Sequence, residues 1–291
     1  MPSTRDIRRR IKSVKNTAQI TKAMQMVASS KMRKAQLAAL AGRPYASLMN
    51  QMLVNVGKDS PDFVHPLMEQ RPVQKRAVLV VSTDKGLCGA LNANLAREAV
   101  KFDKNTTVFV TAGRKGAQFI ARTKRKLAAE FMYKDAPVFA EARAISKLLQ
   151  EMFLKGEVDC VEVLFTGFVN TLTQKVDLRQ LLPVCELKNL LAGAAGETAS
   201  AAGNEVLQHQ FEPGAEQVLG AMLPHYLNYL VYQVLLEAKA SEHSSRMVAM
   251  KNATDNAKQL IKDLSLEYNK LRQANITKEL LEITTAQMAL G

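Results

Sequence analysis

The chain has 291 residues, which suits one large domain or two modest ones. Hydrophobic residues make up 47% and charged residues 23%, a composition that excludes wholesale disorder. The formal net charge of +13 favours an anionic partner: acidic protein, lipid or nucleic acid. Tryptophan is absent and aromatic residues reach only 5%, which disfavours both base stacking and a membrane aromatic belt.

Cysteine and histidine usage indicates neither a disulfide framework nor a metal site. Cys88, Cys160 and Cys185 are odd in number and none pairs at C-x-x-C spacing, and the four histidines are scattered. The sequence contains no run of about 18 consecutive apolar residues, which is the length that a bilayer-spanning helix requires. The basic start superficially suits a transit peptide, but its pattern continues into a structural helix, so we expect no such leader. We therefore predict no metal, no cofactor and a reducing compartment.

Residues 1–57 are predicted to form an N-terminal coiled-coil helix. No Pro or Gly occurs from Ser3 to Ala41, and Ser3-Thr4-Arg5-Asp6 fits a capping pattern. Steps of four and three define a seam of mostly small residues: Ile7, Ile11, Val14, Ala18, Thr21, Ala28, Met32, Ala35 and Ala39. Gly42 and Pro44 are expected to interrupt or kink the helix before its pattern resumes at 45–56.

Residues 58–74 are expected to be a linker, and residues 75–187 a small α/β domain. The expected strands are 77–81, 106–110, 130–133, 158–165 and 171–177. The expected helices are 91–102, 113–123 and 138–155. Strands that alternate with helices predict a doubly wound, Rossmann-like sheet. Residues 188–212 include the Ala/Gly/Ser-rich run 190–203, which is typical of a flexible loop.

Residues 213–291 are predicted to form a C-terminal coiled-coil helix. No Pro or Gly occurs from His225 to Leu290, which permits a helix of roughly 99 Å. A second seam alternates steps of four and three: Leu236, Ala240, His243, Met247, Met250, Thr254, Ala257, Ile261, Leu264, Tyr268, Leu271 and Asn275. The expected fold class is therefore α/β, with a long antiparallel coiled coil of the two terminal helices beside the small domain.

The sequence offers little that resembles a catalytic site. Gly86-Leu-Cys-Gly89 follows the first strand, where open α/β sheets bind ligands, but it matches no phosphate-binding motif. A tight turn that needs glycine explains it better than a ligand loop. Asp255, Asp263 and the neighbouring glutamates alternate with lysines, as on a solvated helix face, so we predict no catalytic residue.

Charge is concentrated at the N-terminus. Residues 1–36 carry ten basic side chains and one acidic side chain, Asp6, a net +9. Cations in the first turns of a helix oppose its dipole, each at a cost of up to about 1 kcal/mol. A solvated face is one explanation; the other is a surface that meets acidic protein or nucleic acid.

Four stretches resemble the gamma subunit of F-type ATP synthases, the central rotor shaft. They are DIRRRIKSVKNT continuing into ITKAMQMVASSKM (6–17 and 20–32), GLCGALN (86–92), YLNYL with EAKASEHSSRMVAMKNATDNA (226–230 and 237–257), and YNKLRQANITKELLEI (268–283). Together they span the whole chain in the order of that family. The resemblance implies a non-catalytic subunit of a proton-translocating enzyme.

In that family the two terminal helices form an antiparallel coiled coil inside a hexamer of alpha and beta subunits. The lower coil and the α/β domain lie on the epsilon subunit and the membrane c-ring. Rotation of the ring then couples proton flow to ATP synthesis. By resemblance, this chain is expected on the cytoplasmic side of a bacterial plasma membrane, attached only through the complex, with no nucleic acid as partner.

The resemblance also assigns partner-interface residues by position. Met24 matches a methionine that faces the acidic lever loop of the beta subunit. Further basic residues on the same helix are expected to face acidic loops of the ring: Arg8, Arg9, Lys31, Arg33 and Lys34. The C-terminal positions implied in coupling and ring contact are Arg246, Arg272, Gln273, Thr277 and Glu282. The apolar residues Leu280, Leu281, Ile283, Met288 and Leu290 would suit an apolar collar.

The sequence departs from part of the family in its cysteines, and it is consistent with two alternative functions. The photosynthetic members carry an inserted pair of redox cysteines, whereas Cys160 and Cys185 lie 25 residues apart without that insert. One alternative is a basic coiled-coil protein that binds nucleic acid, whose affinity would fall steeply with salt. The other is an enzyme that uses the Gly86–Gly89 turn, which would require the α/β domain to bind a ligand.

Overall fold

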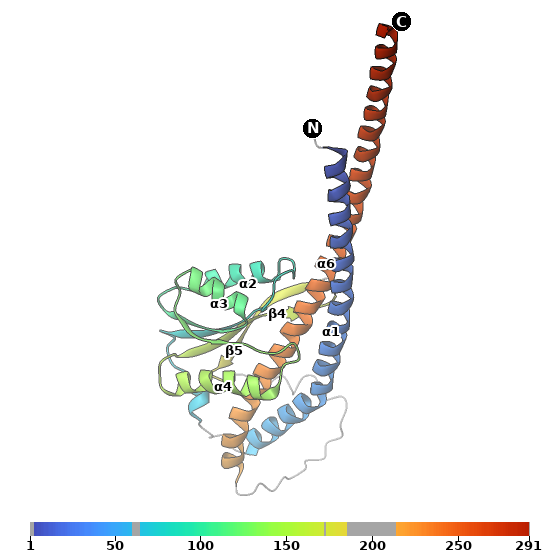
Figure 1. Ribbon diagram of the computed structural model, residues 1–291. Coiled ribbons are helices and arrows are strands. Elements are labelled where there is room, and N and C mark those ends of the chain that lie inside the picture. Colours follow the sequence, from blue (N-terminus) through green and yellow to red (C-terminus); the bar gives the residue numbers. More distant parts are fainter. Residues whose placement is uncertain (1–2, 60–64, 172, 185–213, 291) are drawn as a thin grey trace. The chain divides into compact units, whose positions relative to one another are not determined.

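The computed structural model describes residues 3–59, 65–171, 173–184 and 214–290 (Figure 1). The chain divides into two compact units, one of Met1–Ser30 with Arg246–Gly291 and the other of Lys31–Ser245. Two long helices, α1 (Thr4–Asp59) and α6 (Ala215–Leu290), each contribute to both units. The sequence predicts a different division, into five parts with boundaries after residues 57, 74, 187 and 212. That division stays a prediction.

The helix α1 is not interrupted at Gly42 and Pro44, although an interruption was one of the two outcomes, interruption or kink, that the sequence predicts there. It is continuous through Gly42 and Pro44, although Figure 1 shows that its second half bends. Tyr229 of α6 packs on this stretch, and its hydroxyl donates to the Gly42 carbonyl at 2.6 Å. A methyl group at Gly42 would lie 2.9 Å from that hydroxyl. Packing on α6 therefore stabilises a helical segment whose own sequence disfavours helix.

In the first unit, α1 and α6 pair antiparallel. Arg8 contacts Tyr268, and Thr21 shares a hydrogen bond of 2.8 Å with Thr254, so positions rise along one helix as they fall along the other. Every predicted seam position on α1 is buried or half-buried, as is every one on α6 up to Leu271. The prediction was wrong at the last position, Asn275, which is exposed because α1 begins only at Thr4.

The second unit contains a five-stranded sheet of order β3-β2-β1-β4-β5. Its strands are β1 (Arg76–Val81), β2 (Thr107–Ala112), β3 (Leu127–Phe131), β4 (Cys160–Phe168) and β5 (Gln174–Leu182). Its helices are α2 (Leu91–Val100), α3 (Arg114–Arg122), α4 (Phe139–Leu154) and the 3₁₀ turn η1 (Pro66–Met68). The first four strands are parallel, and β5 returns antiparallel to β4.

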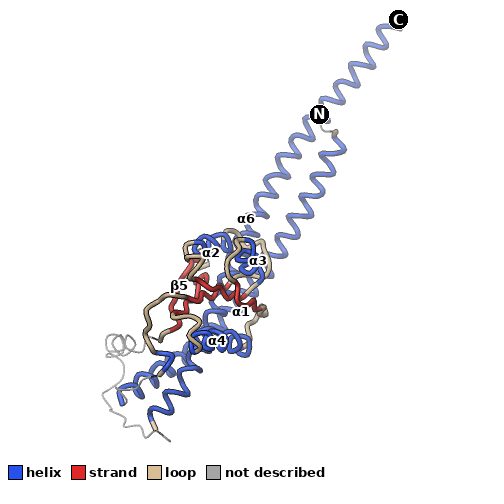
Figure 2. Tube along the Cα trace, turned by 90° about the vertical axis from the view of Figure 1, so that its left-hand side faces the viewer, coloured by secondary structure: helices blue, strands red, loops and turns tan. Residues whose placement is uncertain are grey.

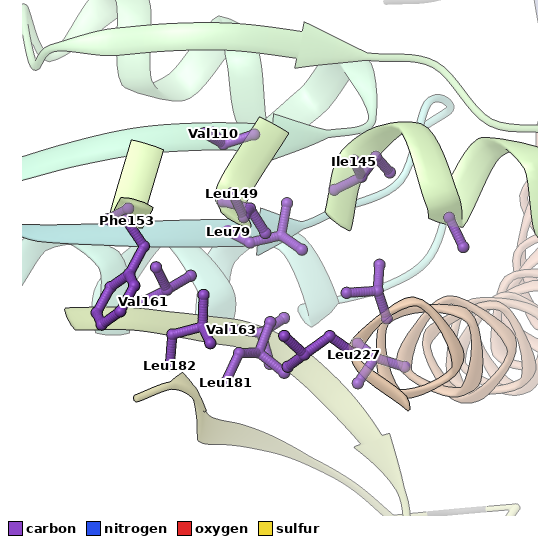
Figure 3. Close-up of a cluster of buried hydrophobic side chains, with 14 of the residues drawn as sticks. Leu79, Val110, Ile145, Leu149, Phe153, Val161, Val163, Leu181, Leu182 and Leu227 are labelled. Atoms are coloured by element: carbon purple, nitrogen blue, oxygen red, sulfur yellow. The ribbon is translucent and has the colours of Figure 1, made fainter. Parts of the chain in front are cut away.

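Helices cover both faces of this sheet, which confirms the doubly wound fold. Figure 2 shows α2 and α3 on one face and α4 on the other. Successive side chains of β1 enter two separate cores: Val78 and Val80 pack under α2 and α3, whereas Leu79 and Val81 pack under α4 and α6. Figure 3 shows the second core, where Phe153 of α4 and Leu227 of α6 close over the strands.

Some predicted boundaries differ from the structure. The last strand runs from Gln174 to Leu182 rather than over 171–177, because the chain reverses at Asn170–Thr173, where the Asn170 N–H donates to the Thr173 carbonyl. The helix α6 begins at Ala215, within two residues of the expected start at 213, and it includes Pro224. The loop predicted over 188–212 lies outside the described residues. None of the described helices combines the length and hydropathy that a bilayer crossing requires.

Candidate partner interface

The predicted interface residues of α1 in the first unit lie on its exposed surface or at the edge of its seam. Arg8 is exposed, donates to the Tyr268 hydroxyl at 3.0 Å and stacks its guanidinium 5.5 Å from the ring centroid. Arg9 is also exposed and pairs with Asp6 at 2.9 Å. Met24 is half-buried, one turn beyond Thr21 in the seam. Arg9 and the outer edge of Met24 are therefore accessible to a partner.

The basic side chains of the N-terminal stretch are exposed on α1. Within the first unit they are all exposed: Arg5, Arg8, Arg9, Arg10, Lys12, Lys15 and Lys22. An exposed ion pair contributes only about 0.2–1 kcal/mol, so no single one of these cations would bind a partner tightly. Summed over a helix, they create a positive potential that attracts acidic surfaces without one deep contact.

The end of α6 extends past the start of α1. Every side chain from 272 to 288 is exposed, which includes Arg272, Gln273, Thr277 and Glu282. Exposed apolar side chains occur on the same stretch, with exposed fractions of 48–85%: Ile276, Leu280, Leu281, Ile283 and Met288. Of the predicted collar, Leu290 lies outside the described side chains. A helix with so much exposed apolar surface is typical of a segment that another chain surrounds.

Arg246 lies further back on α6, in the first unit, and is half-buried. It therefore differs from the fully exposed C-terminal candidates, and a partner could reach only part of its side chain. Its place on the same helix does not bring it close to Arg272 or Glu282, because 26 residues of helix span roughly 39 Å.

The remaining basic candidates belong to the second unit. Arg33 and Lys34 are exposed, whereas Lys31 forms an ion pair with Asp135, which follows β3. The hydrogen bond from Lys31 holds the pKa of the Asp135 carboxyl below its ordinary value, with smaller contributions from the charges of Lys31, Lys239 and His243. Lys31 thus already has a carboxylate partner in its own chain.

The turn after β1 is a closed structural turn. Leu87 and Gly89 have φ of 64° and 61°, a conformation that suits glycine at Gly89 and strains Leu87. The Asn92 amide fills the turn: it donates to the Thr83 hydroxyl at 2.8 Å and to the Cys88 sulfur at 3.3 Å. The expectation of a tight turn fits this geometry.

The helix α6 packs against the carboxyl ends of the strands, the edge at which sheets of this class bind ligands. The Ser245 hydroxyl donates to the Cys88 carbonyl at 2.7 Å. The Glu237 carboxylate accepts from the Phe168 N–H at the end of β4, at 3.3 Å, and lies 3.5 Å from Arg179. Side chains of α6 thus contact the backbone at two of these strand ends.

The role of these α6 residues does not follow from the four-and-three spacing of 236–275, because that spacing predicts only a seam between two helices. The signal was present in the run Ser241-Glu-His-Ser-Ser245, which has too few charges for a solvated face. Within the described residues, no group of three or more His, Cys, Asp or Glu side chains is close enough to hold a metal ion.

Comparison with known proteins covers the whole chain. The family model described as ATP synthase matches residues 3–290. The ATP synthase gamma chain of Opitutus terrae is 52% identical over 99% of both chains, and that of Methylacidiphilum infernorum is 48% identical over the full length of both. These relatives make the nucleic-acid-binding alternative unsupported.

Solved structures agree in fold. A chain of the Tetrahymena thermophila mitochondrial ATP synthase central stalk and c-ring matches with a TM-score of 0.62 and 26% identity, over 80% of this chain and 99% of that one. A chain of the Euglena gracilis mitochondrial ATP synthase matches with a TM-score of 0.70 and 18% identity, over 99% and 94% of the two chains. With the identities to bacterial relatives, these findings place the chain in one family: it belongs to the ATP synthase gamma chains.

Proposed function

We propose that this chain is the central-stalk rotor subunit of an F-type ATP synthase, where it transmits rotation between an ion-driven c-ring and a catalytic hexamer. The observation that carries the proposal is identity of 48–52% to ATP synthase gamma chains over the full length.

The first unit supplies the part that turns inside the ring of alpha and beta subunits. Its exposed tip, residues 272–288, carries the apolar surface that a sleeve of other chains would cover. Its exposed cations on α1 supply many weak contacts to acidic loops. Weak and distributed contacts suit a shaft that turns, because one deep interface would hold it at a single angle.

We assign no bond-making step to this chain, and place ATP chemistry in the surrounding subunits. Glu237 and Ser245 of α6 hydrogen-bond the backbone at the strand ends where a doubly wound fold would bind a nucleotide, which supports this assignment. The epsilon subunit and the c-ring are the proposed partners of the α/β domain and of the parts of α1 and α6 that belong to the second unit. The complex would lie on the cytoplasmic side of the plasma membrane, with this chain attached through its partners.

The residues that we propose as partner contacts differ in how exposed their side chains are. Eight of them are exposed: Arg8, Arg9, Arg33, Lys34, Arg272, Gln273, Thr277 and Glu282. The other three, Met24, Lys31 and Arg246, are half-buried. We propose that the first set meets the ring directly. The second set would hold the helices in position as well.

The function is tested by reconstitution. The purified chain is mixed with alpha and beta subunits, and native mass and ATPase rate are recorded. We expect one copy for each three alpha–beta pairs, with hydrolysis stimulated. Failure to bind the ring, together with salt-sensitive shifts of duplex DNA, would refute the rotor function and restore the nucleic-acid alternative.

The role of Met24 is tested in vesicles that contain the complete complex. Met24→Lys places a new cation beside an acidic partner loop, an attraction of about 4 kcal/mol at 4 Å in an effective dielectric of about 20. We expect protons pumped per ATP to fall more than the hydrolysis rate. Met26→Lys is the matched control, because Met26 is 58% exposed and points to another side of the helix. Equal effects of the two variants would contradict the special position of Met24.

A further inference from the structure

A polar segment of α6, residues 238–244, is buried on all sides. Its sequence is Ala-Lys-Ala-Ser-Glu-His-Ser, and no residue in it exceeds 8% exposure. A two-helix seam buries about two positions in seven, so a second surface must cover the rest. That surface is the carboxyl edge of the sheet in the same unit. The segment has no large aliphatic side chain, so apolar packing alone does not fix its position there.

Lys239 lies at the centre of this segment. Its ammonium is 1% exposed, 3.0 Å from the Glu242 carboxylate, and 3.9 Å from Asp135. It also lies 4.4 Å from the ring centroid of Tyr133, whose hydroxyl donates to the Ser82 carbonyl at the end of β1. A buried ammonium is costly without such partners, and two of them, Asp135 and Tyr133, lie outside α6, so their contacts depend on where the helix is placed.

Asp135 connects this lysine to the other long helix. One of its oxygens accepts from Lys31 of α1 and the other faces Lys239 of α6. The loop that follows β3 thus holds both helices at one level. Because Asp135 is 56% exposed, its pairs are worth little in stability, but they are directional.

Further contacts link the same stretch of α6 to other strand ends. Ser244 donates to the Thr171 carbonyl at 2.8 Å, in the turn between β4 and β5. With Ser245 on Cys88 and Glu237 on Phe168, the helix is tied to the ends of β1, β3 and β4. A slide or rotation of α6 by one residue would break all of these bonds together.

We propose that Lys239 is a positioning residue that fixes the register of α6 against the α/β domain, so that torque applied to the domain turns the helix without slip. The proposal rests on the rotor function proposed above. It adds which residues of the second unit prevent α6 from sliding against the α/β domain. Helices can shift past packed neighbours by whole turns where packing permits two arrangements. The buried ion pair excludes the shifted arrangements, since each would leave a charge unpaired.

The alternative is that the pair contributes only to stability, and the two explanations predict opposite results for one variant. Lys239→Met with Glu242→Gln removes both charges and keeps the volumes. Replacement of a buried ion pair by neutral groups is often neutral or stabilising, so the thermal midpoint should not fall. Loss of register should nevertheless lower the number of protons pumped per ATP.

The experiment uses the assembled complex in vesicles, with ATPase rate, proton pumping and thermal midpoint measured on the same preparation. If neutralising the pair leaves two registers equally populated, pumping per ATP falls about twofold while hydrolysis is retained. Lys258→Met with Asp255→Asn is the matched control: an exposed pair at the same spacing on the same helix, 3.8 Å apart. The control should keep the ratio of the unsubstituted complex.

Asp135→Asn provides a second variant that should assemble even if the buried double change does not, because its side chain is more than half exposed. It weakens the hold on both lysines and should lower the ratio by a smaller factor. An unchanged ratio in the assembled variants would overturn the proposal. A complex with the unsubstituted chain that neither assembles nor pumps would overturn the rotor function instead, so the two failures are distinguishable.

Discussion

Replacing Gly113 with alanine should strongly destabilise the α/β domain. Gly113 precedes α3 with φ of 107° and ψ of 139°, a region that side chains with a Cβ rarely adopt. A Cβ there would lie 2.3 Å from the Ser82 carbonyl oxygen. Ser82 cannot easily move away, because its hydroxyl donates to the Gly113 carbonyl and accepts from the Gly116 N–H, and its carbonyl accepts from Tyr133.

Gly156→Ala is the matched control, since Gly156 has φ of 72° and no atom within 4 Å of an added Cβ. It separates backbone strain from steric overlap. We expect about 1 kcal/mol for the strain alone, partly offset by the lower entropy of the unfolded chain. For Gly113 the overlap adds a backbone shift, and the total should be about 4 kcal/mol.

The assay is thiol labelling of the native chain, since the sequence has no tryptophan to report unfolding. Cys88 and Cys160 are buried at 2% and 6% exposure, so each labels only when its surroundings open. At about 1.4 kcal/mol per tenfold change, Gly113→Ala should speed labelling by roughly a thousandfold and Gly156→Ala by roughly fivefold. Equal acceleration of both cysteines in the two variants would refute the argument from overlap.

Three further outcomes are expected. Phe153→Ala empties a fully buried site in the core under α4 and should lower the free energy of unfolding by about 3–5 kcal/mol, measured from the urea midpoint. Asp159 accepts from two backbone N–H groups, which lowers its pKa; its contribution is present above the ordinary value of 3.8 and is lost as pH falls through the lower folded value. Asp159→Asn should therefore flatten the acid side of the stability curve. Tyr268→Phe removes the hydroxyl that Arg8 donates to but keeps the ring, so the thermal midpoint should fall by about 2 °C or less.

The coiled-coil seams could be predicted because spacing alone determines which side of a helix is apolar. Ile7, Ala28, Ala257 and Leu264 occupy predicted positions and are all buried. The spacing does not show which residue of the other helix faces each seam position. The exposure of Asn275 follows from where α1 begins, which the pattern on α6 could not show.

The parallel strands could also be predicted, because a short continuous run of β-branched and aliphatic residues such as Ala77–Val81 is typical of a strand that is buried on both faces of a sheet. The last strand could not be placed well, because β5 lies at the sheet edge with mixed polar and apolar side chains. A kink at Gly42 and Pro44 was one of the two expected outcomes, but the continuity of α1 through these residues depends on Tyr229, which lies 185 residues after Pro44 in sequence.

The polar segment of α6 shows where sequence reasoning stopped short. The four-and-three spacing selects only Ala240 and His243 of residues 238–244, and it assigns no packing partner to Lys239, Ser241 and Glu242. All three are buried, because this stretch lies between α1 and the sheet edge. An ammonium and a carboxylate three residues apart usually indicate an exposed helix face, and here they form the buried pair. Since the cost of burying them must be met by specific partners, the same residues that defeat the pattern are those expected to fix the register of the helix.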